Sequence, residues 1–246
     1  MSSEKEYIPK RAMSIQAHPD DQEFTVAGTL AKWAQAGCEV ISVIITSGDA
    51  GSNQPEHGEE YKPLLAKLRE REQKAANKIL GVKSTVFLGY PDGELEPTLA
   101  LRKDLTRLIR QYKPETVVIG DPQGMFYGNE YINHPDHRAA AQAALYAVFP
   151  SAETRLIFTD LLEEGYKPHK AKRIYIHGAE KPDTWVDISS TIDLKVKALK
   201  KHRSQLGDWD PGKMMREWAA EEGKEKSLKF AEAFKVMIHE QDRPES

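Results

Sequence analysis

Two short clusters of histidine and aspartate contain side chains that suit metal chemistry. The first is His18-Pro19-Asp20-Asp21 and the second is His134-Pro135-Asp136-His137. His18 and Asp21 are three residues apart, a spacing that puts an imidazole and a carboxylate on one side of a beginning helical turn. Both groups are ligands for divalent transition metals, and a third ligand would complete a site with open positions.

Asp20 is next to Asp21 in the sequence, so in a helical turn its side chain points to a different side than the two candidate ligands. A carboxylate in that place could take a proton from a water molecule that a metal activates. An alternative needs no metal, because Asp20 and Asp21 would also stabilise the positive end of a following helix. The second cluster favours the metal, since either His134 or His137 would complete a two-histidine, one-carboxylate site. The other histidine would remain as a donor for an oxyanion.

Each cluster follows a predicted strand and begins a predicted helix. Residues 13–17 alternate apolar and polar side chains, and apolar residues at helical spacing follow over 24–34. Residues 116–119 form another apolar strand, and the alanine-rich run 139–147 continues as a helix. Ligand sites in open α/β sheets form outside the carboxyl ends of the strands. We therefore expect both clusters at one edge of a sheet.

The rest of the chain alternates strands and helices in the manner of an α/β fold. Strands are predicted at 40–46, 85–88, 173–176 and 185–188, and helices at 64–80, 101–112 and 192–199. With 246 residues and no low-complexity break, residues 1–246 are expected to form a single domain. The tail 208–246 is predicted to be a helical C-terminal extension, whose aromatic residues pack either on the body or on another subunit of a homo-oligomer.

Composition excludes several classes of protein. The net charge is -3 with mixed signs, so there is no basic patch to suggest nucleic acid as a partner. No apolar run is long enough to span a membrane, and residues 1–6 do not resemble a signal peptide. Cys38 is the only cysteine, which excludes an internal disulfide and fits the reducing cytoplasm.

Two long loops follow predicted strands at the same edge. We expect residues 47–62 and 120–133 to wall a pocket for one or two sugar rings, with aromatic contact from Phe126, Tyr127 or Tyr131. Three further features are explained without a direct role in chemistry or, for His177, with that role left open. Asp92 lies in a Pro-Asp-Gly turn, Arg69 and Glu72 form a surface pair, and His177 either lines the site or is a polar strand end.

These residues carry a family resemblance. Ala17 to Glu23 together with His134 to His137 resembles the LmbE/PIG-L family of metal-dependent N-deacetylases, and the similarity extends through Thr46-Ser47-Gly48-Asp49, Arg69 to Gly81, Leu88 to Gly93, Val186-Asp187-Ile188, Lys197-Ala198-Leu199 and His202 to Gln205. It thus covers most of the chain. The resemblance implies a Rossmann-like three-layer fold with a mostly parallel central sheet and helices on both faces.

The resemblance also implies roles for individual residues. His18, Asp21 and His137 match the metal ligands, for which Zn²⁺ is expected and Fe²⁺ or another divalent metal is an alternative. Asp20 matches the general base and His134 the oxyanion-stabilising histidine, while Asp136 would orient a histidine.

The expected activity is removal of an N-acetyl group from a small N-acetylglucosamine-type conjugate. Bacillithiol-type members carry an arginine where this chain has Asn133, which argues against a malate-bearing substrate. The alternatives are another mononuclear metal amidohydrolase such as a thiol-conjugate amidase, a non-haem iron oxygenase, and a non-catalytic metal-holding sugar-binding protein. A dinucleotide enzyme is disfavoured because no Gly-x-Gly-x-x-Gly motif follows the first strand.

Overall fold

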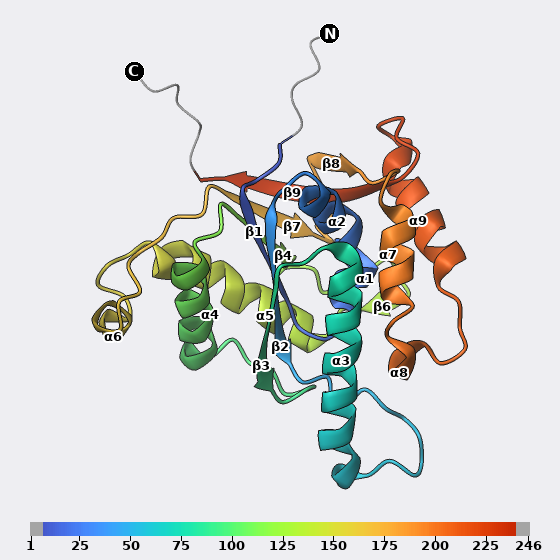
Figure 1. Cartoon of the computed structure of the whole chain (residues 1–246), viewed down its shortest axis with the longest axis horizontal. Helices are drawn as coiled ribbons and strands as arrows, with labels where there is room; N and C mark the ends of the chain where they lie inside the picture. Colours follow the sequence, from blue (N-terminus) through green and yellow to red (C-terminus); the bar gives the residue numbers. More distant parts are fainter. Residues whose placement is uncertain (1–6, 240–246) are drawn as a thin grey trace.

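The computed structural model describes residues 7–239, and within that range one mixed sheet of seven strands forms the centre of the molecule (Figure 1). Its strands are β1 (Arg11–Gln16), β2 (Glu39–Thr46), β3 (Ser84–Tyr90), β4 (Thr116–Gly120), β7 (Arg173–His177), β8 (Thr184–Asp187) and β9 (Ala231–Ile238). The spatial order is β3-β2-β1-β4-β7-β9-β8. The first five strands in this order are mutually parallel, and β9 runs antiparallel to both β7 and β8.

Helices cover both faces of the sheet. They are α1 (Asp21–Thr25), α2 (Ala27–Gln35), α3 (Lys62–Leu80), α4 (Leu99–Tyr112), α5 (Pro135–Tyr146), α6 (Thr159–Glu163), α7 (Ile192–Leu199), α8 (Arg203–Leu206) and α9 (Gly212–Lys224). Two short helical turns, Glu59–Tyr61 and Ala147–Ala152, complete the set within the described residues, and a two-stranded hairpin is made by β5 (Phe126–Tyr127) and β6 (Tyr131–Ile132).

The central strands are buried on both faces, as the runs of aliphatic residues predict. In β1, Met13 and Ile15 pack with residues of α4 and α5, whereas Ala12, which directly precedes Met13, points to the other face and packs with residues of α2, α7 and α9. The helix α3 lies on the same face of the sheet as α2 and α7, and its alanine and leucine side chains pack against both of these helices. This arrangement confirms the predicted α/β fold with a mostly parallel sheet and a layer of helices on each side.

The strand order explains where a site can form. From β1 the chain adds β2 and then β3 on one side, and it later crosses to add β4 and β7 on the other side. The connections after β1 and β4 therefore leave in opposite directions, and ligands of open α/β sheets bind at such a point, outside the carboxyl ends of the two strands. The first cluster of histidine and aspartate follows β1 and the second follows β4, so both lie at this point of the sheet.

The tail departs from its predicted helical structure. Helix α9 is present, but the prediction that the whole of 208–246 is helical is wrong because Ala231–Ile238 is a strand. Phe230 and Phe234 have helical spacing, yet β9 forms ladders with β7 and β8 at once, and the Phe234 side chain is fully buried. Pairing on both edges therefore outweighs the local pattern. Residues 240–246 of the predicted extension lie outside the described residues.

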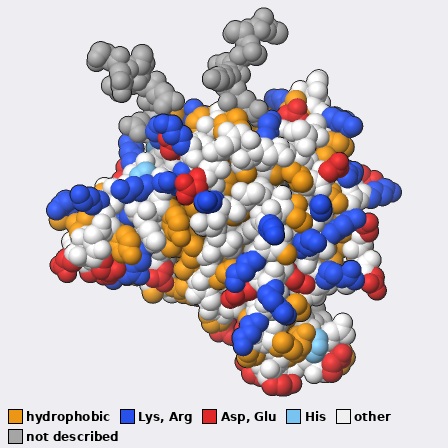
Figure 2. Space-filling view, in the orientation of Figure 1, with side chains coloured by type: hydrophobic (Ala, Val, Ile, Leu, Met, Phe, Trp, Pro, Cys, Tyr) orange, Lys and Arg blue, Asp and Glu red, His pale blue; other side chains and the backbone are white. Residues whose placement is uncertain are grey.

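The surface carries both signs of charge. Lysine and arginine side chains are interspersed with aspartate and glutamate on the face that Figure 2 shows. Among the described residues, none of the helices combines the length and the apolar character that crossing a membrane requires. The loop that leads from β2 into α3 projects beyond the rest of the body (Figure 1).

Candidate metal centre

The loop after β1 holds the first cluster in a tight turn. The backbone N–H and the hydroxyl of Thr46 both donate to the Ala17 carbonyl, at 2.8 and 2.9 Å, which ties the loop to the end of β2. The His18 backbone N–H donates to Asp21 Oδ2 at 2.8 Å. The Asp21 carboxylate is thereby folded back beside the His18 ring, as the spacing of three residues predicts.

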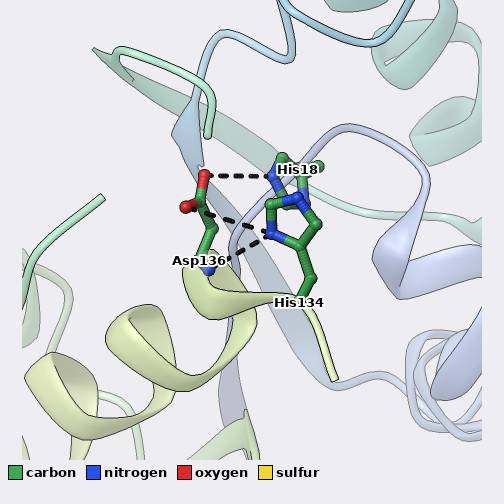
Figure 3. Close-up of side chains that lie close together, drawn as sticks. All are labelled: His18, His134 and Asp136. Atoms are coloured by element: carbon green, nitrogen blue, oxygen red, sulfur yellow. Dashed lines mark hydrogen bonds and ion pairs between the residues drawn. The ribbon is translucent and has the colours of Figure 1, made fainter. Parts of the chain in front are cut away.

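The start of α5 holds the second cluster. His134 is the N-cap residue, and its Nδ1 accepts a hydrogen bond from the Asp136 backbone N–H at 3.2 Å. Pro135 occupies the first helical position, where its missing N–H costs nothing. Figure 3 shows the His18 ring lying against Asp136 and His134, with both of the latter at the N-terminal end of α5. The sheet therefore brings the two clusters together as expected.

Three predicted ligands present their donor atoms to one another. His137 Nε2 lies 3.0 Å from Asp21 Oδ1 and 3.2 Å from His18 Nδ1, and His18 Nδ1 lies 3.4 Å from Asp21 Oδ2. One ligand atom from each residue lies within 4.8 Å of the others. Two imidazole nitrogens and a carboxylate oxygen converging in this way match the donor set of a mononuclear zinc or non-haem iron site.

The opposite ring nitrogens are held by oxygen atoms. His18 Nε2 lies 2.9 Å from Asp92 Oδ1 and 3.3 Å from Asp136 Oδ2, and His137 Nδ1 lies 3.2 Å from Asn133 Oδ1. These acceptors favour a proton on His18 Nε2 and on His137 Nδ1. The lone pairs of His18 Nδ1 and His137 Nε2 are then directed to the shared point. Hydrogen bonds of this kind fix the tautomer and the ring orientation of metal-binding histidines.

A second group could also hold a metal, namely His18, His134 and Asp136. Its atoms have other partners. Asp136 Oδ2 accepts the Gly93 backbone N–H at 2.7 Å and Oδ1 accepts that of Leu95 at 3.2 Å, while His134 Nδ1 accepts that of Asp136. The set of His18, Asp21 and His137 therefore fits a metal better, and Asp136 fits the expected orienting role.

The charges around the site favour a cation. Burial alone would lower the pKa of His18, but Asp21, Asp136 and Asp92 outweigh it and raise the pKa to about 12. Burial would raise the pKa of Asp21, yet the imidazoles of His137 and His18 hold it well below its usual range. Carboxylates that stabilise an imidazolium so strongly would also stabilise a divalent metal ion among the same atoms. Burial and the neighbouring His18 lower the pKa of His134, which keeps that ring neutral.

Asp20 is beside the three predicted ligands and belongs to a different set of contacts. Its carboxylate Oδ2 lies 3.2 Å from Arg69 Nη2, and its side chain is 12% exposed. Burial raises the pKa of Asp20 to about 6, with Arg69 opposing this rise and Asp21 adding to it. A carboxylate whose pKa is near neutrality suits a general base.

The expectation for Arg69 and Glu72 as a surface pair is wrong. Arg69 is 3% exposed, and it donates to the carbonyls of Pro19 and Gly48 under the loops that follow β1 and β2. Gly48 has φ of 64°, and a Cβ there would lie 2.7 Å from Arg69 Nη1. Glu72 accepts from the backbone N–H and the hydroxyl of Ser204. The helical spacing of three residues was real, but tertiary packing turned this face of α3 inward.

Asp92 and Asn133 contact the predicted ligands, which their sequence context did not predict. Asp92 is in the predicted turn, and that turn lies at the carboxyl end of β3, where its carboxylate reaches His18. Asn133 joins the loop to the helix, because its Nδ2 donates to the Gly124 carbonyl at 2.7 Å while its Oδ1 contacts His137. Position at the carboxyl end of a strand was the signal that could have found Asp92.

His177 lies at the end of β7, and its Nε2 contacts Gln16 Oε1 at 3.1 Å. Burial lowers the pKa of His177 to about 4, so the ring is neutral. It therefore sits at the same edge of the sheet as the site and is hydrogen-bonded to the last residue of β1.

The hairpin of β5 and β6 is the exposed wall of this region. Four of its apolar side chains are open to solvent: Phe126 at 64%, Tyr127 at 37%, Tyr131 at 51% and Ile132 at 73%. Burial raises the pKa of Tyr131, and the charges of Asp21 and His18 also act on it. The Tyr131 hydroxyl is thus within electrostatic reach of the predicted metal ligands.

Comparison with known proteins places this architecture in one family. Residues 13–148, more than half of the chain, match the family model for PIG-L, described as GlcNAc-PI de-N-acetylase. The diacetylchitobiose deacetylase of Thermococcus kodakarensis is 32% identical, over 93% of this chain and 83% of the relative. The 1D-myo-inositol 2-acetamido-2-deoxy-alpha-D-glucopyranoside deacetylase of Mycobacteroides abscessus is 29% identical, over 84% of this chain and 85% of the relative.

A solved structure agrees with these relatives. The N,N'-diacetylchitobiose deacetylase from Pyrococcus horikoshii, complexed with its inhibitor MPG, superposes with a TM-score of 0.83 at 31% identity, covering 94% of this chain and 84% of that one. The relatives named here are deacetylases, and this chain shares the α/β fold of the solved one. The chain belongs to the PIG-L family, which confirms the resemblance seen in the sequence.

Proposed function

We propose that this protein is a zinc-dependent N-deacetylase that hydrolyses the acetamide of a small N-acetylglucosamine-type conjugate. The observation that carries the proposal is the position of Asp20, a buried carboxylate that lies beside the converging set of His18, Asp21 and His137 and is paired with Arg69 rather than with these three side chains. Hydrolysis needs such a free base, whereas holding a metal or a sugar does not. The deacetylases among the relatives support the choice of reaction.

His18, Asp21 and His137 would hold the metal. When bound, the metal would supply Lewis acidity toward the acetyl carbonyl and would lower the pKa of a water molecule. Asp20 takes the proton of the attacking water, and Arg69 orients the carboxylate through its contact with Oδ2. Asp20, or a histidine beside it, then returns a proton to the departing amine nitrogen, which leaves as the free amino sugar.

His134 stabilises the charge that develops on the acetyl oxygen. Its Nδ1 accepts the Asp136 backbone N–H, so in the neutral ring the proton is on Nε2 and can be donated. A preorganised donor of this kind is effective because it is already oriented when the negative charge appears. The Asp136 carboxylate, held by two backbone N–H groups, keeps His18 in its orientation.

The substrate would be one or two sugar rings in length. The aromatic hairpin of β5 and β6 lies between β4 and the second cluster in the chain, and the loop before α3 follows β2 at the same edge of the sheet. Exposed Tyr and Phe rings offer apolar faces on which a pyranose ring can pack. Both chitobiose deacetylases among the comparisons are named for a disaccharide substrate, which makes diacetylchitobiose the first compound to test.

The test is acetate release from N-acetylglucosamine and diacetylchitobiose, with metal-depleted protein and zinc-restored protein side by side. We expect release only with the metal present.

A metal-bound protein that hydrolyses neither compound nor any other N-acetyl amino sugar would contradict the proposal and favour a sugar-binding protein. Consumption of O₂ with Fe²⁺ would favour an oxygenase, and release of a larger acyl group would favour a thiol-conjugate amidase. Efficient cleavage restricted to long acetylated polymers would contradict the expected substrate size.

A further inference from the structure

The backbone of Asp20 adopts a conformation that its own sequence does not favour. Its φ and ψ are 102° and -27°, in the left-handed region that residues with a Cβ rarely occupy. Such conformations persist where the surroundings hold them, and they concentrate at functional sites. The Asp20 backbone N–H is buried and donates to Gln73 Oε1 on α3 at 2.9 Å. Gln73 thus contributes to the direction in which the Asp20 carboxylate points.

The orientation of the Gln73 amide is set by its other end. Gln73 Nε2 donates to both carboxylate oxygens of Glu23, at 3.0 and 3.2 Å, and to Asn77 Oδ1 at 3.2 Å. A rotated amide would place its NH₂ group against the Asp20 N–H and its oxygen against the Glu23 carboxylate. Both contacts would be repulsive, so Glu23 keeps the Gln73 oxygen on Asp20.

Glu23 is in turn surrounded by donors. Besides Gln73, it accepts from Gln22 Nε2 at 3.0 Å and from His202 Nε2 at 3.1 Å. Glu23, Gln73 and His202 are each 0% exposed. A buried carboxylate is stable only with such partners, and removal of its charge changes every hydrogen bond in the cluster. His202 directly precedes α8, so the cluster also connects the C-terminal third of the chain to the loop after β1.

We propose that Glu23 and Gln73 are positioning residues for the deacetylation reaction: Glu23 orients the Gln73 amide, and Gln73 holds the Asp20 backbone in its left-handed conformation. The inference rests on the proposed function for its kinetic readout. Neither residue touches the predicted metal ligands in the contacts described. Their loss should therefore lower turnover while metal content and substrate affinity remain.

The test compares two buried carboxylates. Glu23→Gln keeps the shape of the side chain but replaces one of its two accepting oxygens by an NH₂ group, so it can no longer accept from Gln22, Gln73 and His202 together and holds the Gln73 amide less firmly. Glu232→Gln is the matched control, because Glu232 is 5% exposed and accepts from Lys195 and from the backbone of α2, away from the catalytic loop. We expect Glu23→Gln to lower kcat by about tenfold or more with KM and zinc stoichiometry unchanged, as small misplacements of a catalytic group do. Glu232→Gln should keep the parent kcat.

A second pair of variants separates positioning from folding. Gln73→Met removes the acceptor for the Asp20 N–H and should lower kcat in the same way, with thermal unfolding recorded for each variant. The exchange Glu23→Gln with Gln73→Glu restores an amide facing a carboxylate and again offers an oxygen to Asp20. We expect the exchange to recover most of the kcat lost in Glu23→Gln. Losses that simply add would overturn the proposal.

The outcomes distinguish failure of the proposed deacetylase function from failure of the positioning role of Glu23 and Gln73. Parent protein that releases no acetate would refute the proposed function. Active parent protein with an equally active Glu23→Gln variant would refute the positioning role alone. A crystal structure of Glu23→Gln with Asp20 still near φ of 102° and still bonded to Gln73 Oε1 would refute it as well.

Discussion

The buried residues of the site, here called its floor, and the nearby hairpin of β5 and β6 differ in exposure and in how firmly their side chains are held. On the floor, His18 and Asp20 are 7% and 8% exposed, and each has polar partners from distant parts of the chain. On the hairpin, Phe126 and Ile132 are 64% and 73% exposed, and β5 and β6 are two residues long each. The difference agrees with the proposed function: side chains are held in one orientation where the metal and the proton would be handled, and apolar surface is exposed where a sugar ring would bind.

This contrast predicts which kinetic quantity each region controls. Changes on the floor should act on metal content and turnover, because every side chain there is held by hydrogen bonds that a substitution breaks. Changes on the hairpin should act on KM, because an exposed ring contributes binding contact alike in the ground state and the transition state.

The largest effect is expected for His137→Ala. Removal of one of three predicted ligands should lower zinc stoichiometry sharply and turnover by about a thousandfold or more, because the acidity of the water then returns toward its free value. Elemental analysis and circular dichroism would measure metal content and folding. The control is His169→Ala, whose ring bonds to the Pro114 carbonyl at the opposite edge of the sheet. Full zinc content in His137→Ala would reassign the ligand to His134.

Asp20→Asn separates the base from the ligands within the floor. The amide keeps the shape of the side chain but cannot take a proton. Turnover should fall by about a hundredfold or more while zinc and substrate affinity are retained. Asp21→Asn should instead weaken zinc binding, because a neutral amide is a poorer ligand than a carboxylate. If the zinc measurements show the reverse pattern, the two aspartates exchange roles.

A smaller effect is expected for Asp92→Asn, which tests the residues that orient His18. The amide still accepts the His18 Nε2–H at lower strength, and zinc affinity should fall by about tenfold or somewhat more. Asp183→Asn is the matched control, since Asp183 is a half-exposed carboxylate paired with Lys235. Zinc titration in competition with a chelator would measure the change. Equal affinities in the two variants would show that Asp92 has no such role.

The smallest effect is expected on the hairpin. Tyr131→Ala should raise KM for diacetylchitobiose by about fivefold with kcat and zinc content unchanged, since ring packing is worth about 1 kcal/mol. Trp218→Ala, on α9 with a side chain about equally exposed, should leave KM unchanged. A loss of kcat in Tyr131→Ala would contradict the prediction that the hairpin affects KM alone and the floor affects turnover.

Much of the site could be predicted from local pattern. The spacing of His18 and Asp21, and of His134 and His137, restricts each pair to one side of a turn, and the flanking strands and helices direct both to one edge. The alternating apolar pattern is equally local, and it accounts for the α/β class and for most element boundaries. Periodicity and spacing are properties of neighbouring residues, so they can be interpreted without the fold.

Other features depended on contacts between distant residues. Ala231–Ile238 became a strand because β7 and β8 offered two edges to pair with, and no local preference encodes such a partner. Arg69 was turned inward because the loops after β1 and β2 present carbonyl groups to it.

The spacing of the second cluster left both of its histidines open as ligands, the family resemblance implied His137, and the tertiary contacts support the same assignment. Asn133 holds the Nδ1 of His137, and the start of α5 occupies the Nδ1 of His134. The sequence by itself thus determined which residue types could do the chemistry and on which edge they would lie. Only the tertiary structure decided which ring nitrogens face one another and which residues hold them, because hydrogen bonds between residues up to 179 positions apart orient these side chains.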